Sequence, residues 1–454
     1  MARVNIVPSP EPALVFDDRT VTYAELAELA RRTGGALERA ALDPEAPIAF
    51  LAEPLPSALI LAFTLIDAGI PMLPLHPKST ASERARTVAH ANAVLVEPRA
   101  LDASGPGPSP TWLRGNRGAL APLAFVATSG SSGTPKLVEL SRGAFAASAR
   151  ASGENLGDLP RDRWLLALPF AHVGGLSILT RSLSAQRTVV VAPAFDAASM
   201  LECIRKSGVT LASAVPAQVP GLFAEDTQGS LSSLRALLVG GAACPLSYKR
   251  EARARGVPLV STYGLTEGCS QIATESPFER TDPPGSDCGR VLAGIELRTR
   301  AGRIALRGPT LFSRYLGEPT RDPESFFVTE DLGELDERGR LSVHGRADEM
   351  LVSAGENVHP TAVEAVLLAH PAVLEAAVFG IPDERFGVVI AAALVVSGAP
   401  EPVLARLKAD LELEVPRHAW PRRVVVTGAL PKTPLGKVDR RRVARELAAS
   451  VSGW

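Results

Sequence analysis

The chain of 454 residues predicts an α/β fold with mostly parallel sheets, a small β-rich subdomain and a compact α+β unit at the C-terminus. Three observations carry this prediction. Strand and helix patterns alternate at short spacing up to about residue 262, as expected of parallel βαβ units. Short strands and turns dominate from about 285 to 345. The last hundred residues then form a separate mixture of helices and strands.

The first hundred residues show the alternation most clearly. Thr22 and Glu25 form a capping box, which is typical of a helix start. Gly69 follows an apolar helical pattern and predicts where that helix ends. In order, we expect a tight hairpin at 14–21, a helix after Thr22, a strand at 48–51, a helix at 57–68, and strands at 72–75 and 93–96.

The remaining elements follow from the same patterns. Residues 101–118 are rich in Gly, Pro and Ser and predict a surface loop. Further strands, with helices between them, are expected at 123–127, 165–168, 188–192, 209–214, 236–239 and 258–262. The C-terminal unit is expected to hold helices at 360–370, 401–412 and 438–449, and strands at 373–380, 387–396 and 422–426. A boundary near Arg346-Ala347-Asp348 divides the chain into domains 1–346 and 347–454.

Composition and charge exclude several classes of protein. Lys plus Arg number 48 and Asp plus Glu 49, which gives a net charge of −1. Because non-specific nucleic-acid binding needs clustered excess cations, we expect no nucleic-acid partner. A hydrophobic fraction of 46% with 21% charged residues also excludes a disordered chain.

Cysteine spacing and hydropathy point to a cytoplasmic protein. The four cysteines lie far apart with no CxxC pair, which argues against a zinc ribbon or a disulfide framework. The most apolar stretch, 58–75, is interrupted by Asp67, Gly69, Pro71 and Pro74, so it does not predict a membrane span. No signal peptide is visible after Met1.

A run of hydroxyls and glycines after the strand at 123–127 predicts a phosphate-binding loop. Glycines let the backbone approach a phosphate closely, and hydroxyls with one Lys add donors. The alternative is a flexible Ser/Gly linker, although a linker is rarely bounded by a strand and a Pro-Lys pair. The GxxxxGK[ST] spacing of a Walker A loop is absent. The residues of this run are Thr128, Ser129, Gly130, Ser131, Ser132, Gly133, Thr134, Pro135 and Lys136.

This run resembles the phosphate loop of the adenylate-forming superfamily, which contains acyl-CoA synthetases, firefly-type luciferases and peptide-synthetase adenylation domains. Four more segments match that superfamily in its order, and the likeness covers essentially the whole chain. They are YGLTE at 263–267, TED at 329–331, GRAD at 345–348 and PKTPLGK at 431–437. The resemblance implies a large N-terminal domain of doubly wound sheets with a small β subdomain, and a small mobile C-terminal α+β domain.

A second likeness is to the o-succinylbenzoate-CoA ligases of menaquinone synthesis. The segments LPFAHVGGLSILTRSL at 168–183 and YGLTEGCSQIAT at 263–274 are similar to theirs. The implied reaction has two steps. A carboxylate attacks the α-phosphorus of ATP to give acyl-AMP, and the thiol of CoA then displaces AMP. ATP, Mg²⁺ and CoA are the implied cofactors and co-substrates.

The resemblance also implies the site residues. Lys437 is expected to bridge the carboxylate and the α-phosphate, although a surface lysine before a basic helix is the alternative. Glu267 is expected to ligate Mg²⁺ and His172 to orient the acyl carboxylate. The cofactor-binding residues are expected to be the loop residues above except Pro135, with Gly240, Gly241, Ala242, Tyr263, Gly264, Thr266, Asp331, Arg346 and Gly355.

The resemblance also implies which residues bind the acid and which residue acts as a hinge. His172, Ser177, Arg181 and Gly241 are expected to contact the acid, with Arg181 on a second carboxylate. The alternative for Arg181 is a surface residue on one face of a helix, with its charged group in solvent. Asp348 is the implied hinge between the two half-reactions.

Three departures from the superfamily pattern affect these expectations. Glu330 replaces a glycine and is expected to crowd the ribose, Ala354 replaces a glycine near CoA, and Leu137 replaces the glycine after the loop lysine. Three alternatives stay open: another aryl acid such as anthranilate or benzoate, loading of a carrier-protein pantetheine, and a non-catalytic nucleotide-binding relative. A homo-oligomer also stays open.

Overall fold

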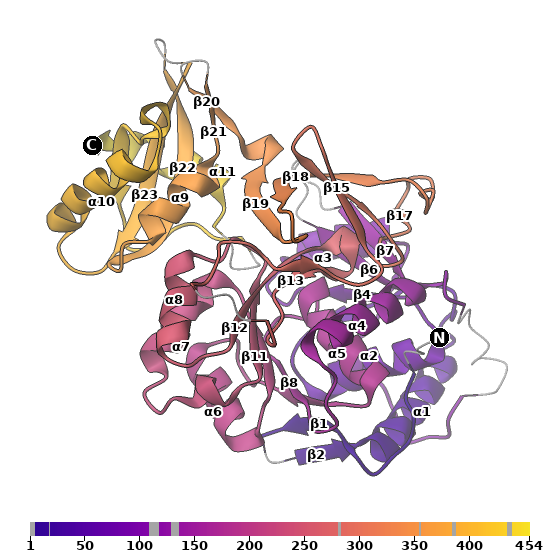
Figure 1. The fold of residues 1–454 in the computed structure, drawn as a ribbon. Helices are drawn as coiled ribbons and strands as arrows, with labels where there is room; N and C mark the ends of the chain where they lie inside the picture. Colours follow the sequence, from indigo (N-terminus) through magenta and orange to yellow (C-terminus); the bar gives the residue numbers. More distant parts are fainter. Residues whose placement is uncertain are drawn as a thin grey trace.

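In the described part of the chain there are two large sheets and three smaller ones, and the C-terminal part projects from the N-terminal part (Figure 1). The computed structural model describes residues 5–17, 19–108, 118–128, 136–279, 283–353, 356–383, 387–433 and 438–454.

The largest sheet has nine strands, and its centre is parallel. Strands β8, β9, β10, β11 and β12 follow one another through helical crossovers, as predicted, and β1 pairs parallel with β9. Antiparallel strands β2, β13 and β14 extend its two edges. The order is β14 (Arg290–Val291), β13 (Ser270–Thr274), β12 (Leu259–Leu265), β11 (Ala236–Gly240), β10 (Leu211–Ala214), β8 (Arg163–Leu166), β9 (Thr188–Val191), β1 (Pro12–Phe16) and β2 (Arg19–Thr22).

The second sheet has six strands and carries the predicted phosphate-loop strand. Strands β6, β4, β3 and β5 are parallel, whereas β7 and β17 are added antiparallel at one edge. The order is β17 (Arg314–Tyr315), β7 (Lys136–Ser141), β6 (Pro122–Thr128), β4 (Met72–Leu75), β3 (Ile48–Leu51) and β5 (Val94–Leu95).

Helices cover both faces of the nine-stranded sheet. On one face, α1, α2, α4 and α5 share a hydrophobic core with strands of both large sheets. On the other face, α6, α7 and α8 pack in a second core. The helix bounds are α1 Tyr23–Arg39, α2 Pro56–Ala68, α3 Ala81–His90, α4 Arg142–Leu156, α5 Val173–Ala185, α6 Ala197–Ser207, α7 Val219–Glu225 and α8 Leu246–Ala254.

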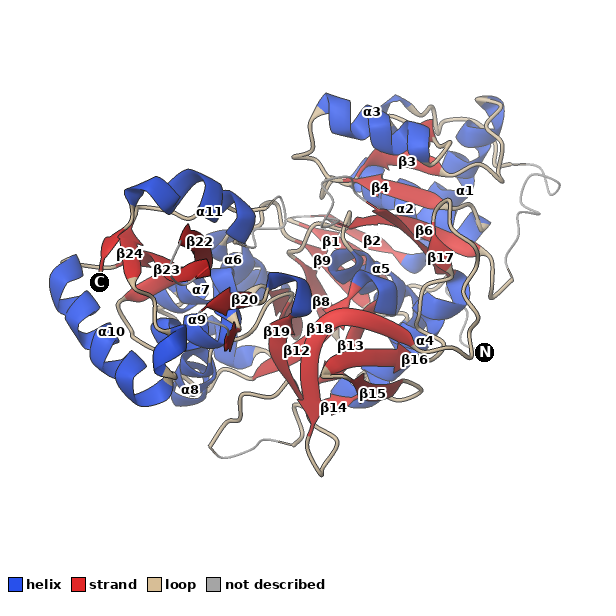
Figure 2. Cartoon of the chain, turned by 90° about the horizontal axis from the view of Figure 1, so that it is seen from above, coloured by secondary structure: helices blue, strands red, loops and turns tan. Residues whose placement is uncertain are grey.

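A four-stranded antiparallel sheet follows and lies beside the C-terminal part (Figure 2). Its strands are β15 (Glu296–Arg300), β16 (Arg303–Arg307), β18 (Phe327–Leu335) and β19 (Leu341–Arg346). The short helix η6 (Ala347–Glu349) and the pair β20 (Leu351–Ser353) and β21 (Glu356–Val358) come next. This is the small β-rich subdomain that the sequence predicts at 285–345.

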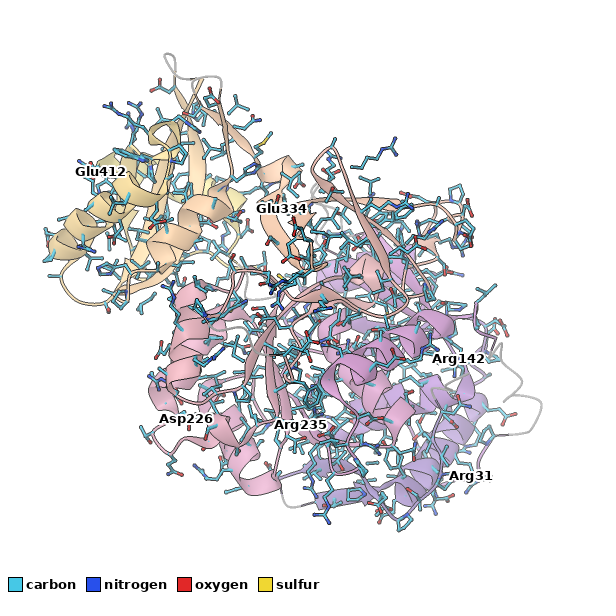
Figure 3. The ribbon with its side chains drawn as sticks, in the orientation of Figure 1. Arg31, Arg142, Asp226, Arg235, Glu334 and Glu412 are labelled. Carbon is cyan, nitrogen blue, oxygen red and sulfur yellow. The ribbon has the colours of Figure 1, made fainter. Side chains whose placement is uncertain are left out.

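The C-terminal part has its own sheet and its own cores. Helices α9 and α10 pack on one face of the sheet and α11 on the other. The strands are β22 (Val373–Asp383), β23 (Gly387–Val396), β24 (Arg423–Val426) and β25 (Ser452–Gly453), and the helices are α9 Pro360–Leu368, α10 Pro400–Glu414 and α11 Arg440–Leu447. Arg31 on α1 and Glu412 on α10 lie at opposite ends of the molecule (Figure 3).

The predicted α/β class and the order of elements are confirmed, and the main differences lie at strand edges. Strands β7 and β13 were not predicted, and β17 was expected only as part of the region of short strands at 285–345, since an antiparallel partner is visible only when its neighbour is known. Thr22 caps α1 with Glu25 as a capping box, and Gly69 ends α2 with φ of 80°. Among the described residues, no helix is long and apolar enough to cross a membrane.

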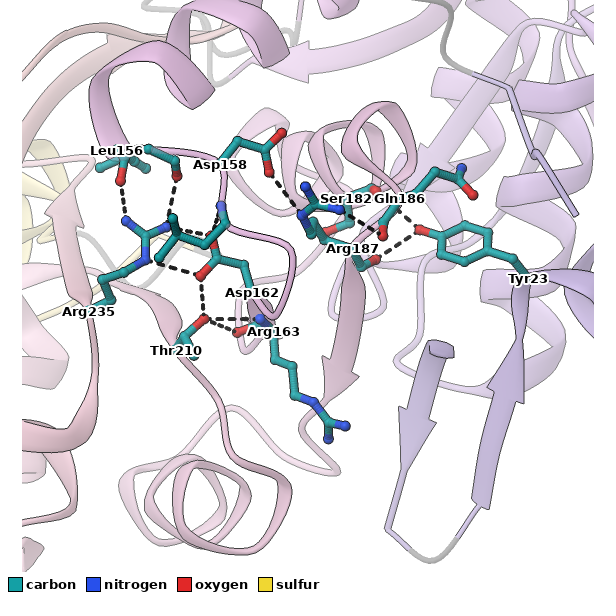
Figure 4. A network of polar contacts seen from close by, with 12 residues as sticks. Tyr23, Leu156, Asp158, Asp162, Arg163, Ser182, Gln186, Arg187, Thr210 and Arg235 are labelled. Atoms are coloured by element: carbon teal, nitrogen blue, oxygen red, sulfur yellow. Dashed lines mark hydrogen bonds and ion pairs between the residues drawn. The ribbon is translucent and has the colours of Figure 1, made fainter. Parts of the chain in front are cut away.

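A buried ion pair ties together the ends of three elements of the large sheet (Figure 4). Asp162 accepts from Arg235 Nε at 3.0 Å and Nη2 at 2.6 Å, and from the hydroxyl of Thr210 at 2.9 Å. Arg235 also donates to the carbonyls of Leu156 and Gly157. All three guanidinium nitrogens and both carboxylate oxygens therefore have partners, which helps a largely buried pair to be tolerated.

Replacing Asp162 by Ala is expected to lower the free energy of unfolding by about 3–5 kcal/mol, because Arg235 keeps its burial and loses its counter-ion. Urea denaturation followed by circular dichroism measures this loss. Asp158→Ala is the matched control, since Asp158 pairs with Arg187 at 3.0 Å and is 44% exposed. We expect the control to lose less than about 1 kcal/mol, and equal losses would contradict the assigned role of Asp162.

Candidate active site

A chain of polar contacts joins the end of β12 to the end of β19. The hydroxyl of Tyr263 donates to Asp331 Oδ2 at 2.6 Å, and Arg346 Nη1 lies 3.3 Å from Asp331 Oδ1. Arg346 also binds Asp348 through two contacts of 2.9 and 3.0 Å. Three predicted nucleotide residues and the predicted hinge residue thus form one continuous network.

The phenol of Tyr263 is held in its protonated form. Burial raises the pKa of Tyr263 far above its usual value, and the charge of Asp331 adds to the effect. Tyr263 is 8% exposed and packs in a core with residues of β13 and β16. Its hydroxyl is therefore a donor to Asp331, and its ring is part of the wall beneath this site.

Glycines shape the backbone around Tyr263. A Cβ at Gly240 would lie 2.5 Å from Cγ2 of Thr262 in the neighbouring strand. A Cβ at Gly264 would collide with the carbonyl oxygen of Ser270, at the point where the β12–β13 register shifts. Beyond Gly240, the turn at Gly241 and Ala242 is exposed, and Gly241 has φ of 83°. The predicted adenine wall is therefore an accessible backbone turn.

Glu267 and Lys136 are linked through Tyr315, which the sequence analysis did not identify. Glu267 belongs to the short helix η5 (Thr266–Gly268), which begins directly after β12 and also holds the predicted Thr266. The Tyr315 hydroxyl donates to Glu267 Oε1 at 2.9 Å, and Lys136 Nζ lies 4.4 Å from the centre of the Tyr315 ring. No spacing in the sequence signals this contact.

Thr128 and Lys136 face each other as the first pair of the β6–β7 hairpin. The hydroxyl of Thr128 donates to the carbonyl of Lys136 at 3.3 Å. The ends of the predicted phosphate loop therefore lie next to each other. The rest of that loop, with two other predicted residues, lies outside the described residues; these are Ser129, Gly130, Ser131, Ser132, Gly133, Thr134, Gly355 and Lys437.

His172 is the residue before the first turn of α5, and its ring faces that of His76. The two ring centres are 5.0 Å apart and tilted by 38°. Burial lowers the pKa of His76, and nearby Lys78 lowers it further, which favours the neutral form at neutral pH. His76 follows β4 and was missed because the contact joins two different sheets.

Arg181, one of the predicted acid-binding residues, is enclosed in the N-terminal core. It is 7% exposed, and its guanidinium lies 5.6 Å from the centre of the Trp164 ring. Burial lowers the pKa of Arg181 to about 10, so the side chain remains a cation at neutral pH. Within the part of the chain that the structure describes, Arg181 Nε and Nη2 and Ser177 Oγ have no hydrogen-bond partner.

An enclosed guanidinium with unused donors is costly without an acceptor. The amide of Gln271 on β13 is costly for the same reason, because its two polar atoms are buried without a partner among the described residues. Gln271 was not singled out from the sequence. These unused groups point to an anionic or water partner that the protein itself does not supply.

The departures at Glu330 and Leu137 have structural explanations. Glu330, which the sequence places near the proposed ribose site, pairs with Arg303 Nη2 at 3.1 Å. Successive side chains of a strand point to opposite faces, so Glu330 and its neighbour Asp331 diverge. Leu137 is 1% exposed in β7 and pairs with Ala127, which makes it a core residue. Ala354 lies outside the described residues.

The cysteines do not contribute a nucleophile to this site. All four are free, and burial raises the pKa of Cys203 and Cys244 to about 11 and that of Cys288 to about 12. Burial also raises the pKa of Cys269 well above its usual value. A thiolate is the reactive form of cysteine, so these thiols are inert at neutral pH.

Known proteins of high similarity span nearly the whole chain. The 2-succinylbenzoate-CoA ligase of Bacillus pumilus is 32% identical over 95% of this chain and 94% of that protein. The indoleacetate-CoA ligase of Aromatoleum aromaticum is also 32% identical, over 96% of this chain and 95% of that protein.

Among solved structures, the o-succinylbenzoate CoA synthetase of Bacillus subtilis with its acyl-adenylate intermediate has a TM-score of 0.85 and 28% identity, covering 95% of each chain. The same enzyme with ATP and a magnesium ion has a TM-score of 0.82, covering 96% of this chain and 97% of that one.

Family comparison covers both parts of the chain. Residues 362–437 match the AMP-binding enzyme C-terminal domain. Residues 3–105 and 117–316 match the AMP-binding enzyme family, to which this chain therefore belongs.

Proposed function

We propose that the chain is an AMP-forming acid-CoA ligase whose acid is o-succinylbenzoate. The observation that supports this choice of acid is the enclosed side chain of Arg181, whose Nε and Nη2 lack a partner within the described residues. A planar carboxylate matches the fork of a guanidinium. The Bacillus relatives act on an acid with two carboxylates, so one can react while the other is held.

The indoleacetate-CoA ligase is equally similar to this chain, so indoleacetate is a second candidate for the acid. Its acid carries one carboxylate, which would leave no anion for Arg181. Loading of a carrier-protein pantetheine in place of free CoA is the alternative for the second step. The unpaired donors of Arg181 favour the diacid over a monocarboxylic acid.

The nucleotide is proposed to bind over the Tyr263–Asp331–Arg346 network. Asp331 can accept both ribose hydroxyls, since an ionised carboxylate has about four acceptor positions. Arg346 then adds a donor at the same sugar, and Tyr263 with the turn at Gly240–Ala242 encloses the adenine. Thr128, Lys136 and Thr266 are proposed to contact the phosphates.

The donor set fits a magnesium ion held mainly by substrate. Among the described residues there is no cluster of three or more His, Cys, Asp or Glu side chains. Mg²⁺ in nucleotide sites is usually held by one or two carboxylates together with phosphates and water. Glu267 alone therefore suffices as its protein ligand, and the bound ion would neutralise charge on the phosphates.

The first step needs positioning and cations more than a protein nucleophile. The acid carboxylate attacks the α-phosphorus, a P–O bond forms, and pyrophosphate leaves with the electron pair of the broken bond. We assign Lys437 to the negative charge that develops between carboxylate and phosphate. We assign His172 to the orientation of the carboxylate, together with Ser177 and Gly241 at the acid.

The second step is proposed to use a rotation about Asp348, between domains 1–346 and 347–454. Core clusters of the first part extend to Val343, and those of the second begin at Leu351. Arg440 binds Glu364 at 2.8 and 3.0 Å and also Glu349, the residue after Asp348. These contacts support a C-terminal body that begins beyond Asp348, in which Gly355 is proposed to line the pantetheine path.

Carboxylate-dependent pyrophosphate exchange tests the proposed reaction. With o-succinylbenzoate, benzoate, anthranilate, indoleacetate and an aliphatic acid, we expect the fastest exchange with o-succinylbenzoate. Thioester formation is then compared with free CoA and with a pantetheine-loaded carrier, and free CoA is expected to be used. An absence of exchange with every acid would disprove the ligase assignment.

Arg181→Met is expected to raise the KM for o-succinylbenzoate by about 10- to 100-fold, because a hydrogen-bonded pair with a charged group is lost. Exchange with benzoate should change little. The variant should also be at least as stable as the wild type in thermal unfolding, since an unpaired buried charge is removed. A similar loss with both acids would show that Arg181 is structural.

Lys437→Ala and Asp348→Pro are expected to impair opposite half-reactions. Lys437→Ala should slow acyl-AMP formation by about 10²- to 10³-fold and spare CoA transfer from pre-made acyl-AMP. Asp348→Pro should leave adenylation largely intact and slow thioester formation, because proline restricts the hinge backbone. Single-turnover assays of each step serve as mutual controls, and equal loss in both steps for Asp348→Pro would argue against the hinge.

A further inference from the structure

Strand β17 is fixed to the strand that leaves the predicted phosphate loop. Backbone bonds of 2.9 Å from Ser313 to Glu139 and 2.8 Å from Leu316 to Leu137 join it to β7. Arg314 Nε also binds the carboxylate of Glu139 at 2.8 Å, and Glu139 is 7% exposed. The position of β17 is therefore set by the six-stranded sheet.

The same segment holds η5, which belongs to the nine-stranded sheet. The backbone N–H of Phe312 donates to the carbonyl of Glu267 at 2.8 Å, and the hydroxyl of Tyr315 donates to its carboxylate at 2.9 Å. The Tyr315 ring packs on Phe312 with centres 4.8 Å apart. Residues 312–315 thus bind both the backbone and the side chain of Glu267.

Tyr315 also contacts the cation at the other side of the site. Lys136 Nζ lies 4.4 Å from the ring centre and 3.8 Å from Glu318 Oε1. A cation over an aromatic face is attracted by the ring quadrupole. One side chain therefore contacts the lysine after the phosphate loop and the carboxylate after β12.

The contact with Tyr315 leaves part of the Glu267 carboxylate available. The hydroxyl of Tyr315 donates to Oε1. Among the described residues, the Tyr315 hydroxyl is the side-chain donor to Glu267, and Oε2 accepts no hydrogen bond from them. This second oxygen can therefore bind a ligand.

We propose that Tyr315 is a positioning residue for the metal–triphosphate complex. Its hydroxyl orients the carboxylate of Glu267 toward the metal, and its ring holds Lys136 toward the phosphates. This inference rests on the proposed function, because it takes Glu267 as the protein ligand of Mg²⁺. Residues that orient a metal ligand through a hydrogen bond are often needed for full metal affinity.

Tyr315→Phe removes the hydroxyl and keeps the ring. We expect the affinity of the protein–ATP complex for Mn²⁺, measured by electron paramagnetic resonance without any acid, to fall by about 10- to 100-fold. The Mg²⁺ concentration needed for half-maximal pyrophosphate exchange should rise in parallel. Transfer of a pre-made acyl-AMP to CoA should be unchanged.

Tyr23→Phe is the matched control. It loses a buried hydroxyl that donates to the carbonyls of Ser182 at 3.1 Å and Arg187 at 2.8 Å. This network lies among α1, α5 and β9, as Figure 4 shows. We expect Tyr23→Phe to lower thermal stability without changing the affinity for Mn²⁺.

The outcomes separate this inference from the proposed function. Wild-type Mn²⁺ affinity in Tyr315→Phe, or an equal loss in Tyr23→Phe, overturns the positioning role. A wild-type chain that binds Mn²⁺ and ATP but exchanges pyrophosphate with no acid disproves the ligase reaction and leaves the Tyr315 comparison valid. A wild-type complex with ATP that binds no Mn²⁺ overturns both.

Discussion

The organisation of this site depends on the hydrogen bonds that the carboxylate of Asp331 accepts. It accepts from Tyr263 at the end of the nine-stranded sheet and from Arg346 at the end of β19, and Arg346 continues to Asp348. A ribose bound at Asp331 would compete for the same acceptors that steady Arg346 and, through it, Asp348. If the ribose binds at Asp331 as proposed, nucleotide occupancy and the orientation of residues beyond 348 would be linked by one shared arginine.

The burial of Arg181 has an electrostatic cost, which its proposed function explains. A guanidinium that is enclosed and short of acceptors lowers the stability of the free protein. Such a cost is typical of a site prepared for an anion, because the same desolvation strengthens the contact once the ligand is bound. Arg235 differs in that its partner Asp162 is supplied by the chain itself, which fits a role in stability, whereas the role proposed for Arg181 is recognition of the acid.

Most of the fold was predictable because its signals are local. Helix caps, turn glycines and apolar runs depend on neighbours within a few residues, which is why α1 begins after Thr22 and α2 ends at Gly69. The motif residues Tyr263, Asp331, Arg346 and Asp348 were also identified from short patterns. Strands β7 and β13 were missed, and β17 was expected only within a region of short strands, since an added antiparallel strand is defined by its partner and carries little local signal.

The sequence by itself determined the class of fold, the order of its elements and the residue types for phosphate, ribose and carboxylate, since backbone propensity and motif chemistry act over short distances. Only the tertiary structure decided which of these groups touch. It brought Tyr315 between Glu267 and Lys136, turned Glu330 away from Asp331 toward Arg303, faced His76 to His172, and enclosed Arg181 with two nitrogens that lack a partner among the described residues. The contacts of Tyr315 and His76 join the two large sheets, and that of Glu330 joins two strands of one small sheet. All of them arise from packing and have no counterpart in sequence spacing.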